Sequence, residues 1–267
     1  MGKWIRRVLM ILFAGILAFS LWKILDIRRS YQTGENTYAD LQQYVKLPET
    51  QPKEDHLPPG PLHSRPDIQF DDDTPWPTID FDALQEICPD IVGWIYIEGT
   101  NINYPVAQGK DNKYYLNHLV DGTWNSSGSI FLDAECGDVF TDRHSIIYGH
   151  HMLNNSMFSA LMDYKKQSFY DAHPVALYIT PERRCKIVLF SAYVAEPTEN
   201  AWQVDFAWGG FGKWLREVED KSLFVPKYTP TEDDQIVTLS TCSYEFDDAR
   251  FVVHGFLLDY TPVTQNP

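Results

Sequence analysis

Short segments rich in β-branched and aromatic residues follow one another from residue 91 onward and constrain the fold more than any other feature. Gly, Asn, Asp and Pro residues separate the segments, as expected where strands end in turns. Eight such segments without an internal repeat fit one closed barrel or one sandwich. The predicted strands are Ile91–Ile97, Ile102–Ala107, Gly128–Asp133, Ser145–Tyr148, Val175–Thr180, Lys186–Val194, Gln235–Thr241 and Phe251–Tyr260.

A few helices are predicted beside the strands. Asp80 can cap a short helix, which should end before Pro89. Apolar residues at helical spacing indicate two further helices, at Ser156–Lys165 and Phe211–Lys221. The second of these lies between the sixth and seventh predicted strands and carries charges on its opposite face.

The N-terminus has a different composition from the rest of the chain. An apolar run, Val8–Trp22, is flanked by basic residues on both sides, and apolar neighbours extend it toward the length that spans a bilayer. A signal peptide cleaved near Ala18-Phe19-Ser20 is the alternative. Either interpretation predicts export, and we favour an uncleaved membrane anchor at residues 1–30.

The proline-rich region that follows separates the anchor from the strands. Residues 31–78 include a segment compatible with a short helix, Tyr31–Val45, and then a run dense in proline, Pro48–Pro77. Because proline at this density disfavours helix and sheet, we expect an extracellular, semi-rigid stalk. Residues 79–267 are then expected to form one catalytic domain.

Charge and cysteine content exclude several classes of protein. The formal net charge is -15, which disfavours binding to nucleic-acid phosphates. The four cysteines form no CxxC pair and no zinc-type cluster with histidine, so neither a metal site nor a disulfide framework is predicted. Three of them, Cys88, Cys136 and Cys185, are expected to be buried thiols.

The fourth cysteine lies where chemistry is feasible. Cys242 ends the strand segment Thr238-Leu239-Ser240-Thr241-Cys242, and Arg250 opens the next strand. If these strands are antiparallel neighbours, the thiol and the guanidinium face each other, as a nucleophile and an oxyanion-binding group would. A packed thiol and an ordinary ion pair with Asp247 or Asp248 are the alternatives.

A histidine pair supplies the candidate acid and base. His150 and His151 end a predicted strand directly after Gly149, and either imidazole could transfer a proton. Their positions in the sequence do not choose between them. His144 and His254 lie at or in strands and are expected to make hydrogen bonds instead.

The TLSTC strand end, the arginine opening the following strand and the Tyr-Gly-His strand end together resemble the sortases, most closely class B. The resemblance covers about residues 79–258 and includes Asp111–Leu116, Gly128–Asp133 and the helical insertion Phe211–Lys221. It implies a mainly β fold: a closed eight-stranded sortase-type β-barrel with N-terminal helices and a helix inserted between the sixth and seventh strands.

The same resemblance implies the function. It assigns His150, Cys242 and Arg250 as catalytic residues and places Asn112, Leu116 and Ser240 along the substrate groove. The implied enzyme sits on the surface of a Gram-positive cell, anchored in the membrane through its N-terminal helix. It cleaves the sorting signal of a surface protein or pilin after Thr and forms a thioester. It then transfers the protein to a peptidoglycan precursor or a pilin lysine, without a cofactor.

Other functions fit the sequence less well. A phosphatase-like Cys-x5-Arg loop is excluded because seven residues separate Cys242 from Arg250, three of them acidic and none glycine. A papain-like protease is excluded by the order of its cysteine and histidine. A stalked, non-enzymatic surface-binding β module and a catalytically degenerate sortase stay as alternatives.

Overall fold

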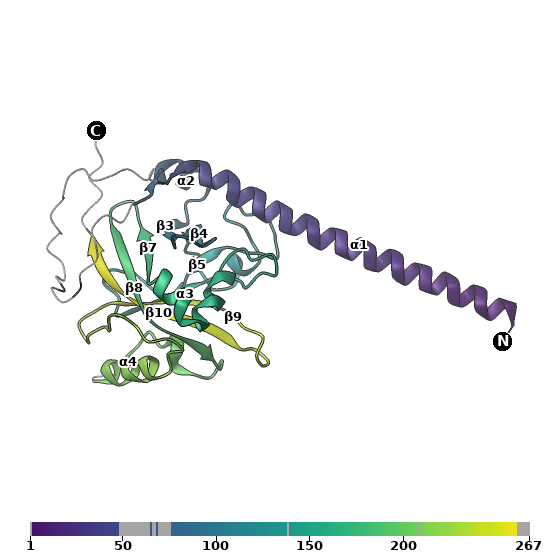
Figure 1. The fold of residues 1–267 in the computed structure, drawn as a ribbon. Coiled ribbons are helices and arrows are strands. Elements are labelled where there is room, and N and C mark those ends of the chain that lie inside the picture. Colours follow the sequence, from purple (N-terminus) through teal and green to yellow (C-terminus); the bar gives the residue numbers. More distant parts are fainter. Residues whose placement is uncertain are drawn as a thin grey trace.

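A closed barrel of eight strands forms the body of the molecule, and one long helix projects from it (Figure 1). The structure, a computed structural model, describes residues 2–47, 65, 68, 76–137, 139–207 and 209–260. Around the barrel the order is β10-β8-β7-β3-β4-β5-β6-β9. The strands are β3 (Ile91–Tyr96), β4 (Asn103–Ala107), β5 (Ile130–Leu132), β6 (His144–Tyr148), β7 (Val175–Ile179), β8 (Arg184–Ala195), β9 (Ile236–Cys242) and β10 (Arg250–Tyr260). All eight predicted strands are confirmed.

Two parallel pairings make the barrel mixed. β4 pairs with β5 and β6 pairs with β9 in parallel, whereas every other neighbouring pair is antiparallel. In the β6–β9 pair, Tyr148 lies opposite Ser240. The carboxyl ends of both strands therefore reach the same end of the barrel, which brings the Tyr-Gly-His segment beside the TLSTC segment.

Along β9, successive side chains point alternately into the barrel and toward its outer face. On β9, Val237 and Leu239 point into the barrel, while Ile236 belongs to a second cluster on its outer face. Helix α4 (Gly210–Asp220) covers that outer face with Trp214 and its apolar neighbours. Because residues two apart share a face of a strand, Thr238, Ser240 and Cys242 lie on the outer face that α4 adjoins.

The short helices agree in part with the predictions. Helix α2 (Phe81–Ile87) is capped as expected, since the Asp80 side chain accepts a hydrogen bond of 3.1 Å from the Ala83 backbone N–H. The inserted helix is also confirmed as α4. Three short helices were not predicted: α3 (Gln167–Ala172), η2 (Tyr114–Leu116) and η4 (Asn200–Trp202).

The helix predicted at Ser156–Lys165 forms later and more tightly than expected. It is the 3₁₀ helix η3 (Ser159–Lys165). Asn155 and Met157 have positive φ angles of 60° and 58°, which are incompatible with a right-handed helix at those residues. The Ser159 hydroxyl donates to the carbonyl oxygens of Met152 and Ser156, so this loop is closed before the helix begins.

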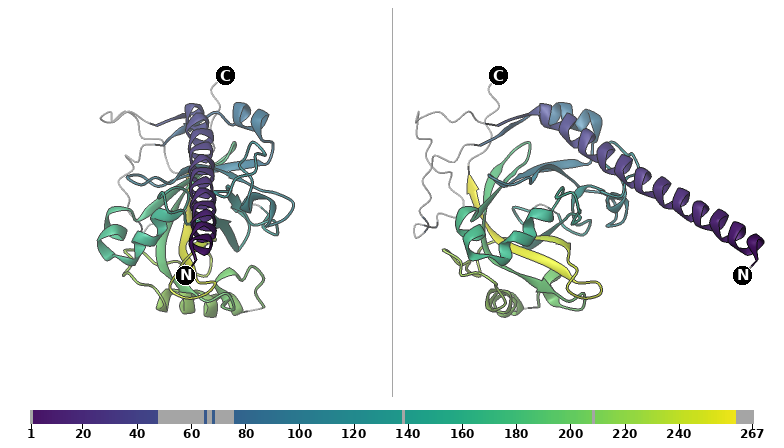
Figure 2. Two further views of the ribbon diagram at one scale, coloured as in Figure 1. Left: turned by 90° about the vertical axis from the view of Figure 1, so that its right-hand side faces the viewer. Right: turned by 45° about the vertical axis from the view of Figure 1, so that its right-hand side comes forward.

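Helix α1 (Lys3–Leu41) joins the apolar N-terminal run to the barrel without a break (Figure 2). The segment predicted as a separate short helix is its last part, followed by the 3₁₀ turn η1 (Gln42–Tyr44). Tyr38 and Leu41 are buried against the barrel. The Tyr38 hydroxyl bonds the Gly128 carbonyl oxygen at 2.7 Å and the Ser129 hydroxyl at 3.0 Å.

The two ends of the proline-rich region meet at one place. Strand β1 (Val45–Lys46) pairs with β2 (Thr78–Ile79) in a small antiparallel sheet, with Val45 opposite Ile79. Most of the region between them lies outside the described residues. The division into an anchor at 1–30, a stalk at 31–78 and a catalytic domain at 79–267 therefore stays a prediction.

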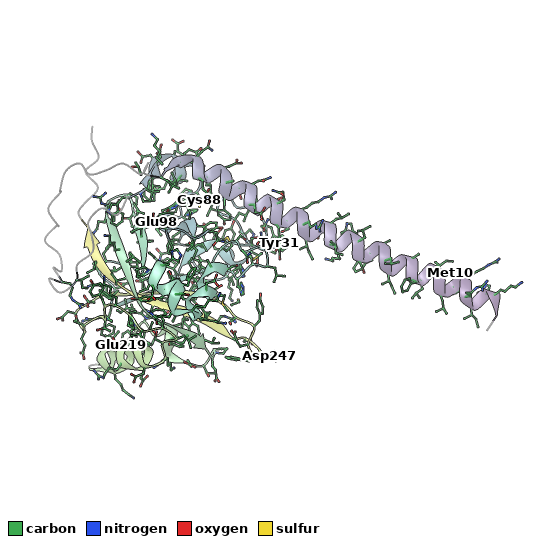
Figure 3. All side chains as sticks on the ribbon, in the orientation of Figure 1. Met10, Tyr31, Cys88, Glu98, Glu219 and Asp247 are labelled. Carbon is green, nitrogen blue, oxygen red and sulfur yellow. The ribbon has the colours of Figure 1, made fainter. Side chains whose placement is uncertain are left out.

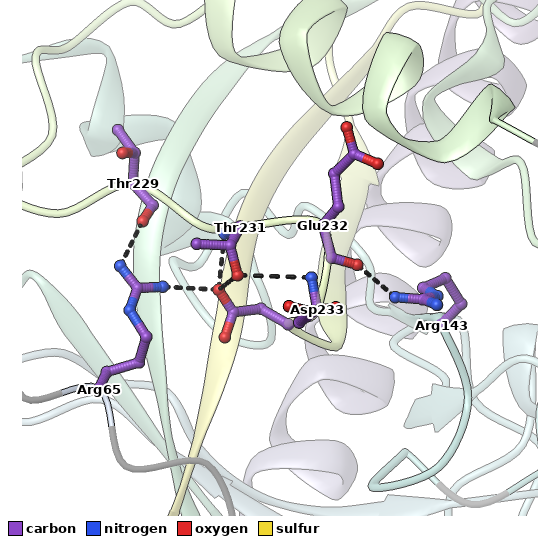
Figure 4. Close-up of polar contacts among 7 residues, drawn as sticks. Arg65, Arg143, Thr229, Thr231, Glu232 and Asp233 are labelled. Atoms are coloured by element: carbon purple, nitrogen blue, oxygen red, sulfur yellow. Dashed lines mark hydrogen bonds and ion pairs between the residues drawn. The ribbon is translucent and has the colours of Figure 1, made fainter.

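One described residue of the proline-rich region is held against the barrel. Arg65 donates to the Asp234 carboxylate at 2.6 Å and to the Thr229 carbonyl oxygen at 3.0 Å (Figure 4). Asp234 also accepts from the backbone N–H and the hydroxyl of Thr231. These contacts precede β9 and lie at the end of the barrel opposite Cys242.

Candidate active site

Cys242 and Arg250 face each other across two adjacent strands. They are direct cross-strand partners, as the sequence predicts, in the antiparallel pair that β9 forms with β10. Such partners have Cβ atoms about 4.5–5.5 Å apart on one face of the sheet. The connecting loop is closed by a hydrogen bond of 2.9 Å from the Ser243 N–H to the Ala249 carbonyl oxygen. The strand register therefore sets the thiol opposite the guanidinium.

Arg250 is oriented by the backbone of its own loop. Its Nη1 donates to the carbonyl oxygens of Asp248 and Ala249 at 2.9 and 3.1 Å. These bonds differ from the alternative that the sequence left open, an ion pair with the carboxylates of Asp247 or Asp248. Within the described residues, Nη2 and Nε of Arg250 have no protein partner. They are available to a carbonyl oxygen or an oxyanion next to Cys242.

His150 reaches the same level from the other side of β9. The ladder pairs Tyr148 with Ser240, and the Gly149 N–H continues it with a bond of 3.0 Å to the Ser240 carbonyl oxygen. Extending this register by two residues would put His150 level with Cys242. A Cβ on Gly149 would lie 2.4 Å from Ile130 Cδ1, so only glycine fits where the chain leaves β6.

A hydrogen bond fixes the tautomer of His150. Its Nε2 lies 2.7 Å from the Leu116 carbonyl oxygen. Because a carbonyl only accepts, Nε2 carries the hydrogen of the neutral ring and Nδ1 is the atom that can take up a proton. His150 therefore has the properties of a general base and acid.

His151 occupies a different environment. Its ring packs on Tyr244 with centroids 5.2 Å apart, and its Nδ1 is buried without a hydrogen-bond partner in the described part of the chain. The Tyr244 hydroxyl also donates to the His151 carbonyl oxygen at 3.4 Å. Of the two histidines, the extended register favours His150 as the one beside Cys242. His151 packs against Tyr244 in the loop.

Ion pairing holds the loop after Cys242. Lys165 pairs with Glu245, and this contact lowers the pKa of the Glu245 carboxyl. The Ser243 hydroxyl donates to the same carboxylate. The acidic loop between β9 and β10 is thereby tied to η3.

The three predicted groove residues have distinct surroundings. Leu116 is 41% exposed and holds His150 through its backbone carbonyl. Ser240 is buried, and its hydroxyl accepts a hydrogen bond of 3.0 Å from Trp202 Nε1. Asn112 uses both ends of its amide internally, donating to Asp133 at 2.9 Å and accepting from the Ala134 N–H at 2.8 Å. Sequence reasoning missed Trp202 and the role of the Leu116 carbonyl, because both contacts join distant segments.

A buried polar chain runs beneath α4 on the same outer face. The Thr238 hydroxyl lies 2.6 Å from His144 Nε2 and 2.6 Å from His254 Nδ1, while His144 Nδ1 lies 2.7 Å from the Gln203 carbonyl oxygen. Both histidines make core hydrogen bonds, as predicted. Burial lowers the pKa of His144 to about 4 and that of His254 well below its usual value.

The remaining cysteines are buried free thiols, as predicted, whereas Cys242 is half-buried. Burial raises the pKa of the Cys136 thiol to about 11. In the described residues, no group of three or more His, Cys, Asp or Glu side chains could hold a metal ion. Of the four thiols, that of Cys242 is the least buried.

Comparison with known proteins agrees with this geometry. Residues 95–258 match the family model described as the sortase domain. Sortase B of Staphylococcus aureus (strain NCTC 8325 / PS 47) is 38% identical over 176 residues, which are 65% of this chain and 72% of the relative. Sortase B of Listeria monocytogenes serovar 1/2a (strain ATCC BAA-679 / EGD-e) is 34% identical over 180 residues, 66% of this chain and 72% of the relative.

Solved structures give the same result. Sortase B from B. anthracis in complex with AAEK1 has a TM-score of 0.69 at 30% identity and covers 87% of this chain and 100% of its own. The Staphylococcus aureus sortase B–substrate complex has a TM-score of 0.64 at 36% identity, covering 68% and 85%. Sortase B complexed with triglycine has a TM-score of 0.64 at 36% identity, covering 68% and 86%.

The barrel, the site and these matches define a cysteine transpeptidase, and the chain belongs to the sortase family. Within that family it is of the sortase B type, since the relatives that it matches at 34–38% identity are sortases B. Its apolar N-terminal helix has the length and composition of a membrane anchor or a signal sequence.

Proposed function

We propose that the chain cleaves a C-terminal sorting signal after Thr and transfers the new carboxyl end to an amine, with Cys242, His150 and Arg250 as its catalytic residues. The observation that carries this proposal is the register of β6, β9 and β10, in which Tyr148 pairs with Ser240 and Arg250 with Cys242. Three chemically complementary groups at one end of adjacent strands favour an enzyme over a binding module.

The reaction proceeds in two halves. The Cys242 thiol gives its proton to Nδ1 of His150, and the thiolate then attacks the Thr carbonyl carbon while Arg250 stabilises the oxyanion through Nη2 and Nε. The C–N bond breaks as His150 gives the proton on Nδ1 to the departing amine, which leaves a thioester on Cys242. The incoming amine then loses a proton to Nδ1 and attacks the thioester, which releases Cys242 and forms a new amide.

The substrates follow from the site and from the relatives. The Staphylococcus aureus sortase B has been solved with a substrate, and a sortase B has been solved with triglycine. We infer that this chain accepts a sorting-signal peptide and an amine such as the glycine end of a peptidoglycan precursor, with a pilin lysine as the other candidate. Leu116 and Ser240 border the peptide, and Asn112 shapes the groove by holding the turn at Asp133.

The location follows from α1. The length and composition of its apolar part support a membrane anchor. We propose that residues 1–30 form this anchor and that the catalytic domain at residues 79–267 lies outside the cell. No cofactor takes part in the proposed reaction, and no nucleic acid is a partner. The proteins that bear sorting signals meet the enzyme at the membrane surface.

The test uses the full chain in detergent and a set of fluorogenic sorting-signal peptides. Cleavage should depend on Cys242 and disappear in Cys242→Ala. Arg250→Ala should lower kcat by about 100- to 1000-fold, as the loss of one oxyanion donor does elsewhere. Arg250→Lys keeps the charge and should recover only part of the rate. A folded protein that cleaves no peptide and gains no adduct would make the degenerate binding module the better assignment.

A further inference from the structure

The contacts of α1 follow a fixed order along its length. Nearest the N-terminus, the Ser30 carbonyl oxygen accepts from Asn125 at 2.8 Å and the Ser30 hydroxyl lies 3.3 Å from Ser126. One turn later, Glu35 accepts from Asn154 at 2.7 Å. Asn154 belongs to the loop that begins with His150. The loops around the active site therefore meet the part of α1 closest to its apolar run.

The opposite end of the domain meets the C-terminal end of the same helix. The Tyr44 carbonyl oxygen, just after α1, accepts from the Asp80 N–H at 3.0 Å, and β1 pairs with β2 there. The two sets of contacts thus fix the orientation of the barrel relative to the axis of α1. The end of the barrel with the active-site loops lies toward the apolar run, and the end with β1 and β2 lies away from it.

The figures show the same polarity. In Figure 3, Asp247 at the tip of the β9–β10 loop lies on the side of the barrel from which α1 leaves toward Met10. The right-hand view of Figure 2 agrees, since the yellow β9–β10 loop lies on the side toward which the helix projects.

Little of the helix separates the apolar run from the domain. Ile24, Leu25 and Ile27 are still exposed apolar residues, and the first contact with the barrel comes at Ser30. The charged Asp26 follows Leu25, and at 1.5 Å per residue Leu25 and Ser30 are about 7.5 Å apart along the axis. The headgroup layer on each side of a bilayer is about 5–7 Å thick, so a spanning α1 places Ser30 at the outer edge of that layer.

An exposed tryptophan lies at this level. Trp124 is 66% exposed and directly precedes Asn125, which holds Ser30. Tryptophan is favoured at the membrane interface because its ring is apolar and its N–H is polar. Arg28 and Arg29, exposed on α1 at the same height, can reach lipid phosphates.

We propose that the active-site end of the barrel rests on the lipid surface, with Trp124 in the headgroup layer and its height fixed by α1. The partner is the bilayer itself, because the helix that crosses it continues without a break into the domain. This proposal rests on the proposed membrane anchor and not on the chemistry of Cys242. It places the reaction beside the membrane.

The test measures the depth of spin labels in the full chain, reconstituted in vesicles of phosphatidylcholine and phosphatidylglycerol. Cys242→Ala removes the accessible native thiol and makes the measurement independent of activity. One label is attached through Thr123→Cys, which leaves Trp124 in place. The control label is attached through Asp233→Cys, an exposed position at the other end of the barrel. Relaxation by membrane-soluble oxygen is compared with relaxation by a water-soluble nickel chelate.

The label at 123 should have a several-fold higher ratio of oxygen to nickel relaxation than the label at 233. Inserting seven helix-forming residues after Ile27 raises the domain by about 10 Å while keeping the face of the helix, and should lower the ratio at 123 to that at 233. Equal ratios at both positions in the unmodified chain would overturn the proposal. A ratio at 123 that falls as the protein is diluted in lipid would also overturn it, because a second copy would then be covering Trp124.

Discussion

Gly128→Ala should slow catalysis although residue 128 touches no substrate. Gly128 has φ +54°, and a Cβ there would lie 2.5 Å from the Tyr115 carbonyl oxygen and 2.7 Å from that of Leu116. Both distances are too short for a real contact, so the oxygens must move. Because both are backbone atoms, the chain has to move with them. The Leu116 oxygen is the one that holds Nε2 of His150 at 2.7 Å. The substitution therefore acts on His150, the proposed acid–base group, through the Leu116 carbonyl oxygen.

The size of the effect follows from the geometry. An alanine in the left-handed region costs about 1–2 kcal/mol, and the displaced carbonyls add to this. We expect a loss of about 2–4 kcal/mol, or a decrease in Tm of about 5–15 °C for a domain of this size. A shift of about 1 Å in a positioned catalytic group lowers a rate by up to ~100-fold, so kcat should fall by about 10- to 100-fold.

Gly122→Ala is the matched control. Gly122 also has a positive φ, +81°, but its Cβ would meet only the Tyr114 hydroxyl at 3.6 Å. Both variants would be assayed for unfolding in urea, for peptide cleavage at saturation and for alkylation of Cys242. The control should lose stability and keep kcat. If Gly128→Ala, measured as folded protein, turns over as fast as Gly122→Ala, the Leu116 carbonyl does not position His150.

Three further predictions test the buried groups. Because His144 and His254 stay neutral in the folded chain, the unfolded chain binds more protons below pH ~6.5, and the free energy of unfolding should fall by about 2 kcal/mol per histidine at pH 5. Urea unfolding at pH 7 and at pH 5 measures this loss, and equal midpoints would contradict it. Arg65→Ala should cost about 2 kcal/mol in the same assay, since it removes a charge-assisted hydrogen bond from the buried Asp234. Of the four thiols, only Cys242 should react with iodoacetamide in the native state, as peptide mass mapping would show.

An exposed ion pair provides the control for Arg65. Lys213 and Glu217 lie 3.5 Å apart on the surface of α4, and Lys213→Ala should change stability by less than about 0.5 kcal/mol. An equal loss in both variants would mean that the contact of Arg65 with the barrel contributes no more than a surface pair.

Local pattern was enough to predict the strands and the covering helix. Each strand carries β-branched and aromatic residues between turn residues, and Trp214, Leu215 and Val218 define one face of α4. Local pattern did not predict the positive φ angles at Asn155 and Met157, which delay η3. Those angles depend on contacts with distant residues, such as the bond from the Met157 N–H to the Tyr104 hydroxyl.

Part of the site could be predicted from the sequence and part could not. The antiparallel neighbours Cys242 and Arg250 are joined by one short loop, so their pairing could be anticipated from the sequence. His150 and His151 could not be separated without the resemblance to sortases, because the parallel pairing of β6 with β9 joins segments far apart in the chain. The internal hydrogen bonds of Asn112 were equally hidden, since Asp133 and Ala134 reach it from another loop.

The central claim is that Cys242 carries the acyl group between two substrates. Intact-mass spectrometry of the quenched full chain, mixed with a cleavable sorting-signal peptide in the absence of an amine, tests this most directly. We predict a mass increase equal to the peptide up to Thr, located on Cys242, labile to hydroxylamine and removed by triglycine with formation of the ligated peptide. Cleavage of the peptide without any adduct on Cys242, or an adduct of the same kind in Cys242→Ala, would contradict the account.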